Sequence, residues 1–298
     1  MEKCREARAA LAVVAAAVSV DFAAGRELAA FYAQMAEASW LGVMFSALIF
    51  GVITALFANL ARRSGVGDMF SLFRSLPGGA VGKLGYVLYA VILVMAGYTL
   101  ISAASRLGAL ALPLRRAPLF GAAFALLAAA WIALRGTKLM WKVGAVFAGL
   151  FALFMLALLL YARLEKLPGM LFVLELRLGG SVVAALCLAA VHAAMCACLA
   201  AGVTVRLAGE VARPARLGAW SGGILFVLLF IGNAALRNQM DELLALEVPF
   251  VALASTWGGA GFWSSAAVMY LAAVTSLSGL FCALLPQKWM LNSKYSQK

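Results

Sequence analysis

Ionisable residues interrupt the first long apolar segment of the chain, in the run 19–28. An ionisable side chain inside a bilayer is costly and is usually turned toward a cavity or a partner. Asp21, with the neighbouring Arg26 and Glu27, therefore predicts a discontinuous helix whose freed backbone groups face a substrate or an ion near the middle of the membrane. The alternative is that Arg26 and Glu27 mark the external helix end, while Asp21 pairs with Arg26 or His192 during assembly.

The only histidine of the chain, His192, lies inside the sixth apolar segment. Cys196 follows four residues later, so the two share a helical face, with Met195 beside them. A soft-metal site is conceivable, but one helix does not easily surround a metal and the sequence has no second Cys/His cluster. We therefore favour a hydrogen-bonding histidine at a helix interface or cavity, and we predict no metal other than Na⁺.

The last apolar segment carries the hydroxyl residues Thr275, Ser276 and Ser278. Hydroxyl oxygens together with freed backbone carbonyls suit a hard cation such as Na⁺. Equally, Ser and Thr commonly bond the carbonyl one turn earlier or help helices to pack. The sequence contains no nucleotide-binding loop, no Ser/His/Asp constellation and no pair of carboxylates suited to hydrolysis, so we do not predict an enzyme and expect no cofactor.

The elements that must position these residues are membrane-spanning helices. The chain is 65% hydrophobic and 12% charged, with a mean hydropathy of +1.00, and its apolar runs are long enough to cross a bilayer. We predict an all-α polytopic membrane helix bundle of about eight transmembrane helices, over residues 9–35, 39–60, 83–105, 117–134, 140–161, 179–205, 217–235 and 261–285. A shorter stretch at 243–255 contains Pro249 and predicts an interfacial or re-entrant segment.

The formal net charge of +12 comes from Lys and Arg between the apolar segments. No basic patch with interleaved aromatic residues is present, so nucleic acid is not an expected partner. On this map sixteen Lys and Arg residues fall in loops on one side and seven on the other, which predicts that both termini are cytoplasmic. The five cysteines lie in the amino-terminal tail or in apolar segments and predict no disulfide framework.

Several short motifs resemble the YkvI-like family of bacterial membrane proteins. The run Phe22 to Leu28 followed by Phe31-Tyr32 resembles the family's first-helix signature, roughly G-A-G-F-A-S-G-Q-E-I with aromatic residues shortly after. Further similarities lie in the third, seventh and eighth helices and in the stretch before the eighth: Met95-Ala96-Gly97, Leu217-Gly218 with Gly222-Gly223, Glu247-Val248-Pro249, and Ala273-Val274-Thr275-Ser276. The resemblance covers residues from about 10 to 285, and this sequence has Asp21 where the family has a glycine.

The resemblance implies a LeuT-fold protein of the amino acid/polyamine/cation transporter superfamily, with inverted repeats and a midplane site. The chain would be one membrane domain, with a first repeat at about 9–161 and an incomplete second repeat at about 179–285. Only 13 residues follow Leu285, too few to cross again, so we expect a core that lacks the last two helices.

The resemblance also implies the site residues and the function. Asp21, Phe22, Gly25, Tyr98 and His192 would line the substrate cavity. The residues Ser19, Val20, Thr275 and Ser276 would bind the coupling Na⁺. We expect a secondary transporter of a small organic solute resembling an amine or amino acid, coupled to Na⁺ or a proton, in the bacterial plasma membrane. The alternative is a non-transporting membrane sensor or assembly subunit with the same core.

Overall fold

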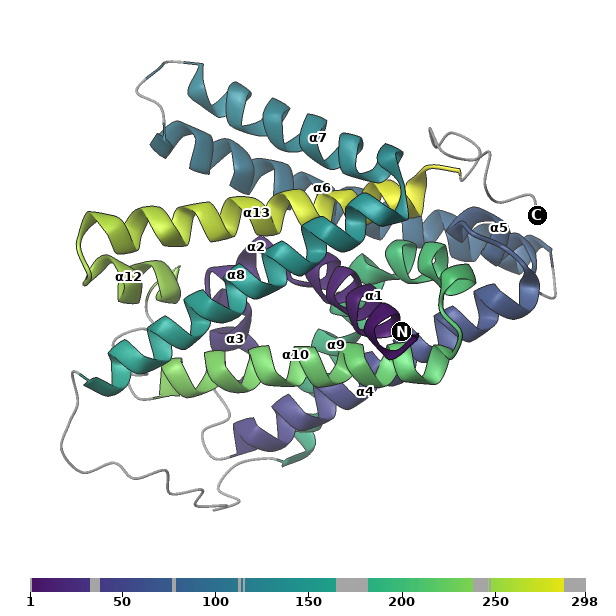
Figure 1. The fold of residues 1–298 in the computed structure, drawn as a ribbon, viewed down its shortest axis with the longest axis horizontal. Helices are drawn as coiled ribbons and strands as arrows, with labels where there is room; N and C mark the ends of the chain where they lie inside the picture. The colour runs from purple at the N-terminus through teal and green to yellow at the C-terminus, as the bar shows by residue number, and fades with distance from the viewer. Residues whose placement is uncertain are drawn as a thin grey trace.

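The computed structural model describes residues 2–32, 38–76, 79–111, 114, 116–164, 182–237, 246 and 248–286. Over these residues the chain is a polytopic bundle of α-helices (Figure 1). The helices are α1 (Glu2–Ala17), α2 (Val20–Ala23), α3 (Arg26–Phe31), α4 (Ser39–Ser64), α5 (Met69–Arg74), α6 (Ala80–Ala111), α7 (Ala117–Arg135), α8 (Thr137–Leu164), α9 (Val182–Leu207), η2 (Ala208–Glu210), α10 (Pro214–Arg237), α12 (Pro249–Ser255) and α13 (Gly259–Leu284).

Seven of the helices in the described ranges are long and apolar enough to cross a membrane: α4, α6, α7, α8, α9, α10 and α13. They match the last seven of the eight predicted segments within a few residues, which confirms those segments as helices of span length. The first predicted segment, 9–35, is instead divided among α1, α2 and α3 over its described residues, and its last residues, 33–35, lie outside the described ranges. The predicted beginning of the sixth segment at 179 and the residues after 286 lie outside the described residues.

The short stretch before the last span, predicted to be interfacial or re-entrant, is described at 246 and 248–255. Within it the structure has α12, whose first residue is Pro249, and the chain then turns at Gly258, where φ is +82°. At 1.5 Å per residue its seven residues extend only about 10 Å. This helix packs against α8 and α13.

The helix α1 lies at the centre of the bundle, in contact with α8, α9, α10 and α13 (Figure 1). Its side chains from Ala9 to Ala17 are mostly Ala and Val and are almost all buried. Small side chains let four neighbouring helices approach one central helix, which is how membrane helices gain close packing. The helix that precedes the predicted break is therefore packed against four other helices.

The helices α6 and α7 form a pair at one edge of the bundle (Figure 1). Both present large apolar side chains outward, among them Leu88 and Ile92 on α6 and Phe124 and Leu127 on α7, which are 53% to 71% exposed. An apolar surface of this extent requires lipid or another protein to cover it. Together with the seven span-length helices, it supports association with a lipid bilayer.

Glycines bring α4 and α10 into backbone contact. A Cβ added at Gly218 would lie 2.3 Å from the carbonyl oxygen of Gly51, and one added at Gly222 would lie 2.8 Å from the carbonyl oxygen of Ala47. Such distances exclude any side chain unless the helices separate. By contrast, nothing lies within 4 Å of a Cβ added at Gly223.

We therefore expect Gly218→Ala to lower the free energy of unfolding of the purified protein by about 1 to 3 kcal/mol, the usual cost of overpacking. Gly223→Ala on the same helix is the matched control and should be neutral or slightly stabilising, because Ala favours helix more than Gly does. The measurement is the midpoint of thermal unfolding in detergent. Equal midpoints for the two variants would contradict the close α4 to α10 packing.

Candidate functional site

The first segment is broken twice, and each break has a local cause. The helix α1 ends at Ala17, and the hydroxyl oxygen of Ser19 accepts a hydrogen bond from the backbone N–H of Phe22 at 3.0 Å, which caps the new helix α2. The second break is at Gly25, whose φ of +83° is in the left-handed region that glycine tolerates best. The predicted discontinuous helix is confirmed.

Two neighbouring elements satisfy backbone carbonyls that the breaks set free. The Ser276 hydroxyl on α13 donates to the carbonyl oxygen of Val18 at 2.9 Å. At the second break, the backbone N–H of Phe250 on α12 donates to the carbonyl oxygen of Ala24 at 3.0 Å. Inside a membrane an unpaired carbonyl is costly, so these two contacts stabilise the broken form of the helix.

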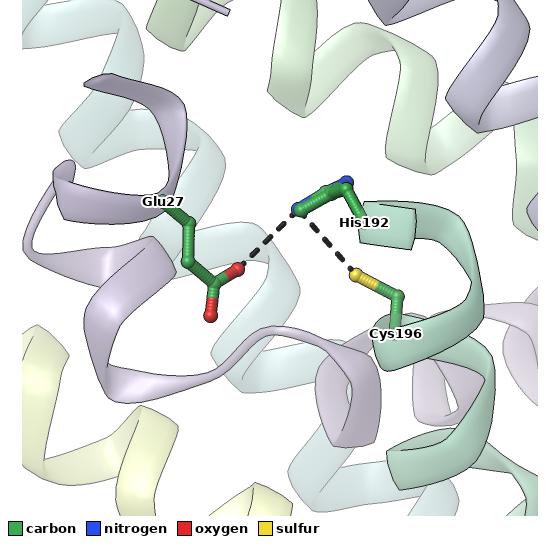
Figure 2. Close-up of side chains that lie close together, drawn as sticks. All are labelled: Glu27, His192 and Cys196. Carbon is green, nitrogen blue, oxygen red and sulfur yellow. Dashed lines mark hydrogen bonds and ion pairs between the residues drawn. The ribbon is translucent and has the colours of Figure 1, made fainter. Parts of the chain in front are cut away.

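The turn at Gly25 directs α3 so that Glu27 reaches the buried His192 of α9, as Figure 2 shows. One carboxylate oxygen of Glu27 lies 3.3 Å from Nε2 of His192, and the other accepts a hydrogen bond from the Ser19 hydroxyl. The Sγ atom of Cys196 lies 3.6 Å from the same Nε2. Glu27, His192 and Cys196 each direct a potential ligand atom toward a common point, all within 4.8 Å of one another.

The other ring nitrogen of His192, Nδ1, also has polar partners. The Tyr32 hydroxyl lies 2.8 Å and the Ser46 hydroxyl 3.0 Å from Nδ1 of His192. The rings of Phe22 and Phe31 lie with their centroids 6.1 Å and 5.2 Å from the imidazole. Both ring nitrogens therefore have polar partners, and apolar rings cover the histidine.

The cluster can hold either protonation state of the histidine. A hydroxyl both donates and accepts hydrogen bonds, so Tyr32 and Ser46 can face either an unprotonated or a protonated Nδ1. His192 is fully buried, while the side chain of Glu27 keeps 12% of its surface exposed. A buried histidine in contact with a partly accessible carboxylate is an arrangement that can store and release a proton.

The predicted substrate residues fall into two groups in the structure. Phe22 and His192 lie together, and Gly25 forms the turn between Phe22 and Glu27. Asp21 is on α2 and is exposed. Tyr98 is separate: it is 72% exposed on α6, so the expectation that it lines the same cavity is corrected. The buried face of α6 is made by other residues, such as Gly97 and Leu100.

The predicted ion-binding residues are also only partly brought together. Ser276 contacts the first break through Val18, as expected for a hydroxyl beside freed carbonyls. Thr275 instead bonds the carbonyl oxygens of Leu271 and Ala272 in its own helix, at 3.0 and 3.1 Å. Val20 is buried. The hydroxyl of Ser19 is engaged by Glu27 and by the N–H of Phe22.

Sequence reasoning did not assign Glu27, Tyr32 or Ser46 to the site. A signal for Glu27 was present, because it follows the helix-breaking Gly25 and coincides with the acidic residue of the family signature. Tyr32 follows in the same signature as one of its aromatic residues. Ser46 lies in an uninterrupted apolar span, and no local pattern distinguishes it from a packing serine.

Gly25 gives a direct test of the break. A Cβ at this position would lie 2.9 Å from the Phe250 ring and would also be strained by the positive φ. We expect Gly25→Ala to destabilise the protein by about 1 to 3 kcal/mol. Adding Phe250→Ala to Gly25→Ala should remove the clash between the new Cβ and the Phe250 ring. The double variant should therefore be destabilised by less than the sum of the two single substitutions. Strict additivity in thermal unfolding would contradict the contact.

No family model and no curated protein matches the chain.

Proposed function

We propose that the chain is an ion-coupled secondary transporter of a small organic solute that carries an ammonium group, such as an amine or an amino acid. The observation that carries this proposal is the doubly broken first helix, which brings Glu27 against the buried His192. Polar, non-helical backbone in a membrane protein is tolerated where it is covered by protein or lines a cavity, and in transporters such breaks form the binding site.

The packing of the helices supports a LeuT-like core. If α1 to α3 form the first span, then α9 is the sixth span and begins the second repeat. In that case α10 is the equivalent of α4, and α13 is the equivalent of α6. The members of each pair are in contact, as are α1 and α9. Elements near a two-fold axis lie beside their own equivalents, so these contacts are what an inverted repeat requires.

The charges at the break favour a cationic group on the solute. Asp21 and Glu27 contribute two carboxylates, against the single positive charge of the exposed Arg26. The partly exposed Glu27 lies 3.3 Å from Nε2 of the histidine. An ammonium group can bind a carboxylate and backbone carbonyls together, which makes it the best match for this surface.

Of the two coupling ions that the sequence suggests, the contacts favour the proton. The Glu27 and His192 side chains form a pair that can gain or lose a proton, and hydroxyls of Tyr32 and Ser46 accommodate both states. The hydroxyls proposed for Na⁺ are engaged with protein atoms, Thr275 with its own helix and Ser276 with Val18. A proton needs only the contact between Glu27 and His192, whereas Na⁺ needs several oxygen ligands around one point.

Alternating access requires that α1 can be released at one end, and ion pairs hold that end. Arg5 lies 3.7 Å from Glu210 of η2, and Glu6 lies 3.6 Å from Arg216 of α10. Glu6 is only 1% exposed. On the predicted topology this end is cytoplasmic, where these pairs would close the inner side and break when it opens.

One observation favours the alternative of a non-transporting sensor or assembly subunit. The helix α9 continues without interruption from Val182 to Leu207, whereas an inverted repeat with two broken helices would interrupt it near His192. Binding without transport would be the expected behaviour if only the first helix can rearrange.

Flux measurements on the purified chain in proteoliposomes distinguish these functions. A panel of radiolabelled amino acids and amines is added outside, with an inward proton gradient, an inward Na⁺ gradient or no gradient. We expect accumulation of at least one solute that depends on the proton gradient and stops with a protonophore. Solutes that raise the thermal stability of the protein but never accumulate would overturn transport in favour of the sensor.

A further inference from the structure

The cluster at the end of α3 has the composition of a metal site as well as of a proton site. It combines a carboxylate, an imidazole and a thiol, from Glu27, His192 and Cys196 (Figure 2). The three come from two helices, so the objection that one helix does not surround a metal no longer holds. We propose that this cluster binds one borderline-soft divalent cation of the Zn²⁺ class.

The two distances at His192 agree with a tetrahedral ion. With Zn–N and Zn–O bonds of about 2.0 to 2.1 Å and a Zn–S bond of about 2.3 Å, the N to O edge of a tetrahedron is about 3.4 Å and the N to S edge about 3.6 Å. In the structure Nε2 of His192 lies 3.3 Å from the nearer oxygen of Glu27 and 3.6 Å from Sγ of Cys196. The two edges at the histidine are thus already at the lengths that a shared ion requires.

The surroundings of the ligands fit the same assignment. A metal on Nε2 requires the proton on Nδ1, and the oxygens of Tyr32 and Ser46 lie 2.8 and 3.0 Å away as acceptors for it. The Ser19 hydroxyl holds the second oxygen of Glu27. Such outer contacts orient metal ligands and commonly change metal affinity by about 10 to 100-fold.

Charge also balances at this site. Binding converts the Cys196 thiol to a thiolate and releases its proton to solvent, so a divalent ion would meet one thiolate and one carboxylate. Its own charge is then neutralised by two ligands in a region that disfavours net charge. Three protein ligands leave a fourth position for water or a solute group, as in sites that exchange ligands.

A bound ion would connect α3 to α9 and occupy the lone pairs that Glu27 and His192 offer to a proton. The ion would thereby hold the broken helix in this arrangement, and the rise in thermal stability on binding would report it. Metal binding itself does not depend on the proposed transport, since it needs only the three side chains in place.

The test uses the full chain, purified in detergent and treated with chelator, and measures Zn²⁺ binding by calorimetry and by thermal stability. We expect one ion per chain, a rise in the unfolding midpoint, and affinity at least about tenfold weaker in Cys196→Ser. The matched control is Cys198→Ser on the same helix, which should bind as the unchanged protein does. Equal affinity in Cys196→Ser and Cys198→Ser would overturn the site.

A second readout covers the case in which Cys196→Ser fails to fold. Co²⁺ added to the unchanged protein should give a thiolate-to-metal charge-transfer band. In Glu27→Gln, which lacks the carboxylate ligand, this band should need a higher Co²⁺ concentration to appear. A Co²⁺ spectrum without thiolate character would overturn the proposal. Neither measurement uses a gradient or a solute, so failure of metal binding and failure of transport are separate results.

Discussion

Replacing Glu27 with glutamine is expected to abolish proton-driven accumulation of solute in proteoliposomes. Glutamine has nearly the same shape but does not carry the negative charge that pairs with Nε2 of His192 across 3.3 Å. A hydrogen bond to a charged group contributes about 1.5 to 3 kcal/mol, which corresponds to a loss of about 10 to 100-fold in solute affinity if the carboxylate also binds the ammonium group. The coupling step should be lost altogether, because glutamine does not titrate.

The exchange of solute for solute separates these two effects. Exchange at equal solute concentrations needs no net movement of protons, so Glu27→Gln should retain it at a raised half-saturating concentration while losing accumulation. Arg26→Gln is the control for a change of charge at the same turn, since Arg26 is the adjacent ionisable residue and is exposed; it should retain accumulation, because losing a positive charge there does not weaken the binding of an ammonium group. Normal accumulation by Glu27→Gln would show that this carboxylate is not the coupling group.

Removing the imidazole in His192→Ala should produce the largest loss of stability in the site. The side chain is fully buried and contacts Glu27, Tyr32 and Ser46 through its two nitrogens. Its removal leaves a cavity and several polar groups without their partner, for which a loss of about 3 to 5 kcal/mol is typical. The midpoint of thermal unfolding in detergent should fall accordingly.

The neighbouring residue Val191 provides the control for this substitution. It is 50% exposed on the same helix, so Val191→Ala should change stability by less than about 0.5 kcal/mol. If His192→Ala and Val191→Ala unfold at similar temperatures, the polar contacts around the imidazole do not stabilise the protein.

The sequence was sufficient to predict the long spans. An apolar run of about 20 residues meets the length requirement of the bilayer by itself, and α4, α10 and α13 lie within a few residues of the predicted segments. The break in the first span could also be predicted, because Asp21 and Gly25 disfavour a continuous buried helix by charge and by backbone conformation. These are local properties that a single segment carries.

Which residues make up the site is decided by contacts between segments that are far apart in the sequence. Whether Glu27 faces solvent or His192 is decided by the rotation of α3 after the left-handed turn at Gly25. The contact of Tyr32 with His192 joins residues 160 positions apart. Tyr98 was assigned wrongly for a related reason: α6 is apolar on all its sides, so its sequence does not indicate which face packs inward.

The central claim is that Glu27 and His192 act as one unit across the broken helix, and a double-mutant cycle tests it most directly. The measurement is the free energy of unfolding of the unchanged protein, Glu27→Ala, His192→Ala and the double variant. We predict that the double variant is destabilised by about 1 to 3 kcal/mol less than the sum of the single effects, as for groups in direct contact. Destabilisation equal to that sum would contradict the account, because it would show that the two side chains do not interact.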